Sequence, residues 1–131
     1  MGRIPAVEQR SGNAPAPDTL ASAGYAVARL CGELDMTRRE EIVATLRPLA
    51  QSDMPLVDLR DVTYLDSSAL GALIGLRKAV AKGGYRVSLI ISSAKIRQIF
   101  AMTRIEELFD IYETEGAACL RNVHPIVRPP R

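Results

Sequence analysis

Two short apolar segments separated by one amphipathic segment constrain most strongly what this chain can fold into. Residues 55–60 and 85–91 are rich in Val, Leu and Ile and have the length of buried strands. Between them, residues 67–82 carry apolar side chains at helical spacing, and a Gly-Gly pair follows as a helix stop. A strand, a helix and a strand within 37 residues form a βαβ unit with parallel strands and a right-handed crossover. This unit predicts an α/β fold.

The chain before this unit continues the alternation of strand and helix. Residues 25–31 form a strand candidate, which Gly32 is expected to end. Thr37, with Glu40 three residues later, forms a capping box that opens an amphipathic helix. Pro48 is expected to close or distort the last turn of that helix.

The chain after this unit adds a further helix, a strand and a helix. Ser93 is expected to cap an amphipathic helix that includes Ile96 and Phe100. The remaining expected elements are a weak strand near 20–22, an edge strand at 108–112 and a last short helix at 114–120. Together these elements predict a single α/β domain with a mixed β-sheet of four to five strands and about four helices packed on it.

Proline and charge separate the ends of the chain from its middle. Six of the eight prolines lie in residues 1–19 and 121–131, which we interpret as a flexible N-terminal tail and a flexible, basic, Pro-rich C-terminal tail. The net charge is +2, and the C-terminal tail contributes +3 of it, while residues 20–120 carry −1. A nearly neutral domain argues against a dedicated nucleic-acid surface.

Several functional classes lack the residues that they require. One His and two distant Cys provide no ligand set for a zinc or iron site. The longest apolar run, residues 69–76, is far shorter than the roughly 18 residues of a membrane span, and Arg3 is not followed by the apolar segment of a signal peptide. We therefore expect a cytoplasmic protein. Cys31 and Cys119 are then interpreted as buried, reduced thiols, with redox control of binding as the alternative.

The most informative segment is Asp-Val-Thr-Tyr-Leu-Asp-Ser-Ser-Ala-Leu-Gly at residues 61–71. It connects the carboxyl end of a buried strand to the start of a helix, where open α/β sheets place their sites. The helix N-terminus would stabilise a phosphate on the hydroxyl of Ser67 or Ser68. Alternatively, these two serines only cap the helix. The spacing alone leaves both interpretations open.

This segment, preceded by Gly-Glu-Leu-Asp at residues 32–35, resembles the STAS family, and most closely the bacterial anti-sigma factor antagonists. The resemblance covers residues 20–120 and implies that Ser67 is the phosphoacceptor. It departs from the family at Ala69, where Gly is usual, and Ala makes the start of the helix firmer. The predicted partner-binding surface consists of Asp35, Asp66, Ser67, Ser68, Ala69, Gly71 and Gly75.

The resemblance also implies a cycle of partner switching without a cofactor. The unmodified chain would bind an anti-sigma factor that is also an ATP-dependent serine kinase, and would thereby release a sigma factor. Phosphorylation of Ser67 would end this binding, because the phosphate adds about −1.5 to −2 charges beside Asp66. A serine phosphatase would restore the binding form. No direct contact with nucleic acid or a membrane is expected.

A stripe of small and basic residues on the helix after Ser67 has two interpretations. Gly71, Gly75, Lys78 and Lys82 follow helical spacing away from the main apolar side, and each interior Gly costs about 1 kcal/mol relative to Ala. The glycines either form a surface on which a partner helix docks or pack closely against another element of the same domain.

Two other functional classes require residues that this chain lacks. A hydrolase would need a positioned base for Ser67, but there is no Gly-x-Ser-x-Gly motif and the only His, His124, lies in the C-terminal tail. A nucleotide-binding protein would need a Gly-rich phosphate loop, which is absent. The remaining alternative is a STAS regulatory module of a transporter or of a larger signalling assembly.

Four aspartates also admit a cation site or a phosphoaspartyl receiver. No lysine stands where a receiver requires one, so these carboxylates are interpreted as solvated or helix-capping groups. They are Asp35, Asp58, Asp61 and Asp66.

Overall fold

The structure, a computed structural model, describes residues 8–10 and 25–123. In chain order the described strands and α-helices are β1 (Glu8–Arg10), β2 (Tyr25–Leu34), α2 (Arg39–Leu46), β3 (Pro55–Leu65), α3 (Ser67–Ala81), β4 (Ser88–Ile90), α4 (Ala94–Met102), β5 (Asp110–Tyr112) and α5 (Glu115–Val123). Short 3₁₀ turns cover Met36–Arg38, Arg47–Gln51 and Ile105–Leu108.

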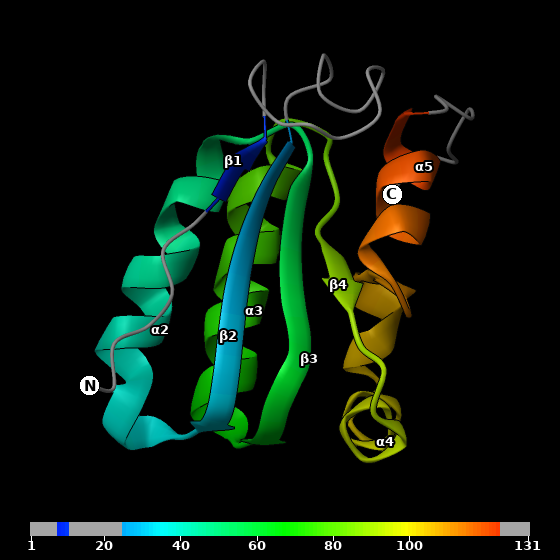
Figure 1. The fold of residues 1–131 in the computed structure, drawn as a ribbon. Helices are drawn as coiled ribbons and strands as arrows, with labels where there is room; N and C mark the ends of the chain where they lie inside the picture. Colours follow the sequence, from blue (N-terminus) through cyan, green and yellow to red (C-terminus); the bar gives the residue numbers. More distant parts are fainter. Residues whose placement is uncertain (1–7, 11–24, 124–131) are drawn as a thin grey trace.

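The strands form one mixed sheet in the order β1-β2-β3-β4-β5 (Figure 1). Among the described strands, β1 is antiparallel to its neighbour β2, and the other pairs are parallel. Helices α2, α3 and α4 pack on one face of the sheet, while α5 packs on the other against β2, β3 and β4. The predicted α/β fold, its mixed sheet and its four helices are therefore confirmed.

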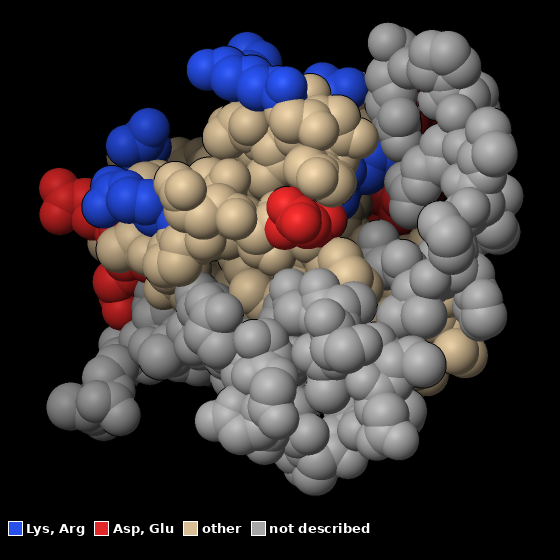
Figure 2. Space-filling model, turned by 90° about the horizontal axis from the view of Figure 1, so that it is seen from above, with Lys and Arg blue, Asp and Glu red and all other residues tan. Residues whose placement is uncertain are grey.

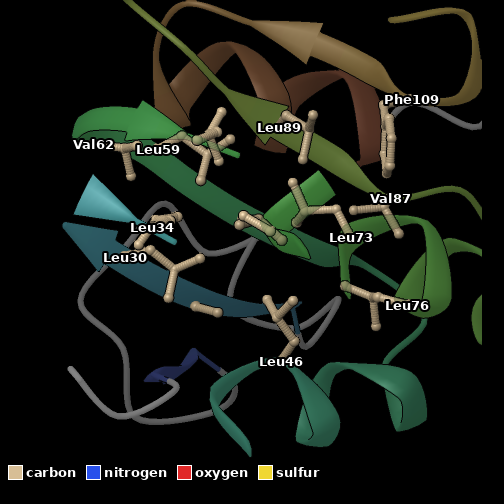
Figure 3. Close-up of a cluster of buried hydrophobic side chains, with 14 of the residues drawn as sticks. Leu30, Leu34, Leu46, Leu59, Val62, Leu73, Leu76, Val87, Leu89 and Phe109 are labelled. Atoms are coloured by element: carbon tan, nitrogen blue, oxygen red, sulfur yellow. The ribbon is translucent and has the colours of Figure 1, made fainter. Parts of the chain in front are cut away.

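The main core lies between the sheet and the helices α2, α3 and α4. Alternate residues of the parallel strands point into it, because successive side chains of a strand face opposite sides. Phe100 and Phe109 close one end with their rings edge to face and 6.3 Å between centroids. Figure 3 shows side chains from strands and helices meeting in this layer, among them Leu30, Leu34, Leu46, Leu59, Val62, Leu73, Leu76, Val87 and Leu89.

The strands β2 and β3 both continue beyond their predicted ends. Gly32 does not stop β2, and residues 61–65 are part of β3 rather than a connection. The two extensions pair with each other as far as Leu34 and Leu65, with register shifts on the way. Gly32 has φ +78°, and the Arg38 guanidinium donates to the carbonyls on either side of it at 2.9 Å. The glycine is thus accommodated in an irregular strand.

The predictions for the ends of helices and strands are correct at some residues and wrong at others. The predicted capping box at Thr37 is wrong, because Asp35 is the cap and accepts from the Thr37 N–H at 3.0 Å. Two other predictions are confirmed: α2 gives way to a 3₁₀ turn at Pro48, and Ser93 accepts from the Ile96 N–H at 3.3 Å to cap α4. Strand β4 begins three residues later than predicted, because the N–H of Tyr85 is still bonded in the turn that ends α3.

Two described elements lie partly or wholly in the segments interpreted as tails. Strand β1 lies inside the segment interpreted as an N-terminal tail, and α5 continues past residue 120 to Val123. The predicted strand near 20–22, His124 and residues 125–131 lie outside the described residues. Of the two cysteines, Cys119 is buried as predicted, but Cys31 is exposed, so its assignment as a buried thiol is wrong.

Candidate functional site

The candidate site lies where β2 and β3 end and α3 begins (Figure 1). The N–H of Asp66 donates to the carbonyl of Leu34 at 3.1 Å, which joins the last residues of the two strands to the start of the helix. Because parallel strands end at the same edge of a sheet, residues from distant parts of the sequence meet here.

Asp66 holds this edge together with both carboxylate oxygens. Its Oδ1 accepts from the N–H of Ala69 at 3.0 Å and caps α3, and its Oδ2 accepts from the N–H of Met36 at 2.9 Å. The interpretation of Ser67 or Ser68 as the cap is therefore wrong. Asp66 adopts extended backbone geometry, as a cap residue does, and both serines already belong to the helix.

The hydroxyl of Ser67 is consequently unused by the fold. Ser67 is the first residue of α3, it is exposed, and no residue in the described ranges forms a hydrogen bond with its side chain. Ser68 is half-buried beside it. An exposed hydroxyl on the first turn of a helix lies at the positive end of the helix dipole.

Asp35 is the second carboxylate of the site. It accepts from the hydroxyl of Thr37 at 2.5 Å and from the N–H of the same residue at 3.0 Å. The hydrogen bond from the Thr37 hydroxyl contributes most to lowering the pKa of Asp35 below its usual value, with the nearby Arg38 contributing less. The structure thus brings Asp35, Asp66 and Ser67 together, because Met36 directly follows Asp35 and bonds to Asp66.

Three predicted members of the partner surface, all on α3, differ in exposure. The side chain of Ala69 is 1% exposed and belongs to the core, so it does not contribute to that surface. Gly71 and Gly75 are exposed, and a Cβ on either would meet no atom of the described residues within 4 Å. The alternative in which these glycines permit close packing within the domain is therefore wrong.

Sequence reasoning missed Met36. Met36 is 69% exposed, and its backbone N–H donates to the carboxylate of Asp66, while its side chain is apolar. Met36 thus adds a large exposed apolar side chain to an edge that carries the carboxylates of Asp35 and Asp66. The signal was its place directly after the Gly-Glu-Leu-Asp segment.

The interpretation of Asp58 as a solvated or helix-capping carboxylate is wrong. It is 6% exposed and forms ion pairs with Arg29 on β2 and with Arg60 on its own strand, the latter at 2.7 Å. Arg29 also pairs with Glu115 of α5 at 2.9 Å, so the cluster attaches that helix to the sheet. Burial raises the pKa of Asp58, but the hydrogen bonds and charge of Arg60 outweigh burial and the net pKa lies below its usual value.

The other carboxylates fit the expected interpretation. Asp61 is exposed, while Asp35 and Asp66 are helix caps. Over residues 8–10 and 25–123, no group of three or more His, Cys, Asp or Glu side chains is arranged to hold a metal ion. Within the same residues, no helix is both long and apolar enough to span a membrane.

Charges of both signs share the end of the molecule opposite Ser67. Figure 2 views this end, where β2 and β3 begin, and shows Lys and Arg interspersed with Asp and Glu on the described surface, with uncharged residues over much of it. The described part of this face is therefore not the uniformly positive surface that binds the phosphates of a nucleic acid.

Comparison with known proteins gives one family and consistent relatives. The STAS domain family matches residues 16–118. A STAS-domain containing protein of Pseudomonas aeruginosa is 46% identical over 56 residues, which cover 43% of this chain and 55% of that protein. The anti-sigma-B factor antagonist of Bacillus subtilis is 32% identical over 83 residues, or 63% of this chain and 76% of that protein. The chain therefore spans about half of the first relative and three quarters of the second.

Solved structures share the fold. The anti-sigma factor antagonist SpoIIAA in its unphosphorylated form has a TM-score of 0.62 at 18% identity, covering 92% of this chain and 100% of its own. The Bacillus SpoIIAA in its phosphorylated form has a TM-score of 0.60 at 21% identity, covering 88% of this chain and 98% of its own.

Proposed function

The chain belongs to the STAS domain family, and from that premise we propose that it is an anti-sigma factor antagonist regulated by phosphorylation of Ser67. In the proposed cycle, the unphosphorylated chain binds an anti-sigma factor and a sigma factor is released. The chain acts by binding and not by catalysis. The names of its Bacillus subtilis and Staphylococcus aureus relatives, which are anti-sigma-B factor antagonists, support this assignment.

The observation that carries the proposal is the division of roles between Asp66 and Ser67. Asp66 supplies the helix cap, while the neighbouring hydroxyl is exposed and bonded to no described residue. A kinase can therefore reach the hydroxyl, and the phosphate displaces no hydrogen bond that the fold requires. The free N–H groups of the first helical turn favour the phosphorylated form of the chain itself.

The phosphate would change binding through charge. It adds about −1.5 to −2 charges at pH 7 to an edge that already carries Asp35 and Asp66. A partner fitted to a neutral hydroxyl would meet added bulk, repulsion and a desolvation cost. The likeness of this fold to SpoIIAA in both phosphorylation states supports a switch that leaves the fold intact.

The proposed partners follow from this cycle. The anti-sigma factor is also the ATP-dependent serine kinase that modifies Ser67, and a serine phosphatase reverses the modification. The cycle would operate in the cytoplasm, and the chain would contact neither DNA nor a membrane directly.

The first experiment tests the phosphoacceptor. The full chain is incubated with its cognate anti-sigma factor kinase and ATP, and the phosphopeptide is mapped by mass spectrometry. We expect modification of Ser67 in the wild type and in Ser68→Ala, and none in Ser67→Ala. Modification of Ser68 alone, or of no residue, would overturn the assignment.

The second experiment tests the mechanism by isothermal titration with the same kinase. Ser67→Ala should bind like the wild type, and Ser67→Glu should bind at least about tenfold more weakly. Gln98→Glu is the matched control, because it places the same new charge at an exposed position of α4. Equal affinity of Ser67→Ala and Ser67→Glu would remove the electrostatic mechanism. If the chain instead bound a transporter or a large signalling assembly and no kinase, the role of a regulatory STAS module would replace the proposal.

A further inference from the structure

A groove of 290 Å³ separates α2 from α3 on the helical face of the sheet. We refer to it as the α2–α3 groove. Apolar and small side chains form most of its lining, with one arginine near each end of its α2 wall. The lining residues are Arg39, Val43, Leu46, Arg47, Ala50, Gly71, Ala72, Gly75, Leu76 and Ala79.

On the α3 side, the groove is lined by the smallest residues, so few side-chain atoms project into it. Gly71, Gly75 and Ala79 recur every four residues along one face, over about 12 Å of helix. Open space lies above both glycines, since a Cβ on either would have no neighbour within 4 Å. The cost of two interior glycines is therefore not offset by packing inside the domain.

The groove is continuous with the proposed phosphorylation site. Ser67 precedes Gly71 by four residues, so its side chain lies on the same face of α3, one turn before the groove begins. Both α2 and α3 begin at this edge of the sheet (Figure 1). A segment seated in the groove would pass close to Ser67.

The positive charges beside the groove favour an occupant that carries carboxylates. Arg39 and Arg47 are exposed, and neither forms an ion pair with a carboxylate in the described part of the chain. None of the described residues that line the groove is acidic. An apolar floor between two unneutralised arginines complements an apolar stripe flanked by carboxylates.

We propose that the α2–α3 groove receives an amphipathic helix of the anti-sigma factor, with apolar side chains on its floor and carboxylates facing Arg39 and Arg47. This inference rests on the proposed function and specifies the partner's chemistry. It also explains why the phosphate acts on binding: at the mouth of the groove, it repels the carboxylates that the arginines attract.

The test measures the affinity of the full chain for its cognate anti-sigma factor by isothermal titration. Gly75→Leu fills the groove, and Arg47→Glu reverses the charge of its α2 wall. Each has a matched control outside the groove: Gly116→Leu, where a Cβ also meets open space, and Arg97→Glu on the exposed side of α4. We expect at least about tenfold weaker binding for the groove variants and changes within about twofold for the controls.

Thermal unfolding accompanies the titration. Gly75→Leu replaces a poor helix former with a good one in open space, so its Tm should not fall below that of the wild type. Weaker binding by a variant that is at least as stable as the wild type locates the effect in the groove.

The other outcomes distinguish this inference from the function on which it rests. If Ser67→Glu weakens binding but Gly75→Leu binds like the wild type, the groove is not the docking site and the proposed function stands. If the wild type does not bind the anti-sigma factor, both fail. If Gly75→Leu converts a dimeric free chain to a monomer, or shifts the amide resonances of residues 11–24 in the free chain, the occupant is a second copy or this chain itself, and the proposed partner helix is wrong.

Discussion

Replacing Asp66 by Ala should destabilise the fold far more than replacing Ser67 by Ala. Loss of the cap to the Ala69 N–H costs about 1 kcal/mol. Loss of the second bond, to the Met36 N–H, adds about 1 kcal/mol, because that group is near the surface and water can replace the carboxylate. The sum of about 2 kcal/mol corresponds to a fall in Tm of about 8 °C for a domain of this size.

Urea unfolding followed by circular dichroism measures this difference at pH 7. Ser67→Ala and Ser68→Ala should stay within about 0.5 kcal/mol of the wild type, since neither hydroxyl is the cap. Asp66→Asn is the conservative control: it keeps an oxygen that can cap the helix and should recover about half of the loss. The reasoning is refuted if either serine variant is destabilised as much as Asp66→Ala, because a serine would then be the cap.

Three further predictions concern the strands and the two cysteines. Because the pKa of Asp58 is lowered in the fold, its contribution to stability is present above pH 4 and is lost as the pH falls through the lowered pKa. Asp58→Asn should therefore cost about 2 kcal/mol of stability at pH 7 and make the loss of stability at acid pH less steep. Urea unfolding at pH values from 7 to 2.5 would measure both effects. Gly32→Ala should cost about 1–2 kcal/mol because of its positive φ, whereas Gly71→Ala should gain about 0.5–1 kcal/mol; equal Tm values would contradict this contrast. Cys31 should react with a thiol reagent in the folded chain and Cys119 only after unfolding, so equal rates without denaturant would contradict their different burial.

The sequence predicted those features of the fold that depend on neighbouring residues. The βαβ unit, the turn at Pro48 and the cap at Ser93 are local, and the structure contains all three. The lengths of β2 and β3 depend instead on their pairing with each other. An arginine side chain supports the irregular end of β2, so a glycine that normally ends a strand lies inside one.

The ion pairs of the sheet also depend on residues that are distant in the sequence and therefore could not be predicted from it. Asp58 is predicted to be solvated because only one of its partners, Arg60, lies near it in the sequence, and the other is distant. Arg29 lies 29 residues away, and the Glu115 that Arg29 also binds lies 86 residues from that arginine. Only the fold brings the three together, and their mutual hydrogen bonds permit the burial of Asp58.

At the candidate site, the sequence identified Asp35, Asp66 and Ser67, which the fold brings together, but it did not predict which residue caps α3. An Asp-Ser-Ser segment before a helix contains three residues that can cap, and their preferences as caps are nearly equal. In the fold Asp66 is the cap, because its carboxylate can accept hydrogen bonds from both the Ala69 N–H in α3 and the Met36 N–H. The glycine stripe likewise admitted two interpretations until the open space above Gly71 and Gly75 excluded internal packing.

In the proposed cycle, this division of roles would allow a single phosphate on Ser67 to act as a switch on binding. A charge of −2 about 6 Å from one partner carboxylate, at an effective dielectric constant of about 40, gives roughly 3 kcal/mol of repulsion, or about 100-fold in affinity. Ser67 can carry that charge at no structural cost, because Asp66 already holds the helix cap and the strand ends. If the serine itself were the cap, phosphorylation would disturb the start of α3 and binding would be lost together with local structure. With separate residues for the cap and the phosphate, the fold has only to keep Ser67 exposed at the mouth of the α2–α3 groove.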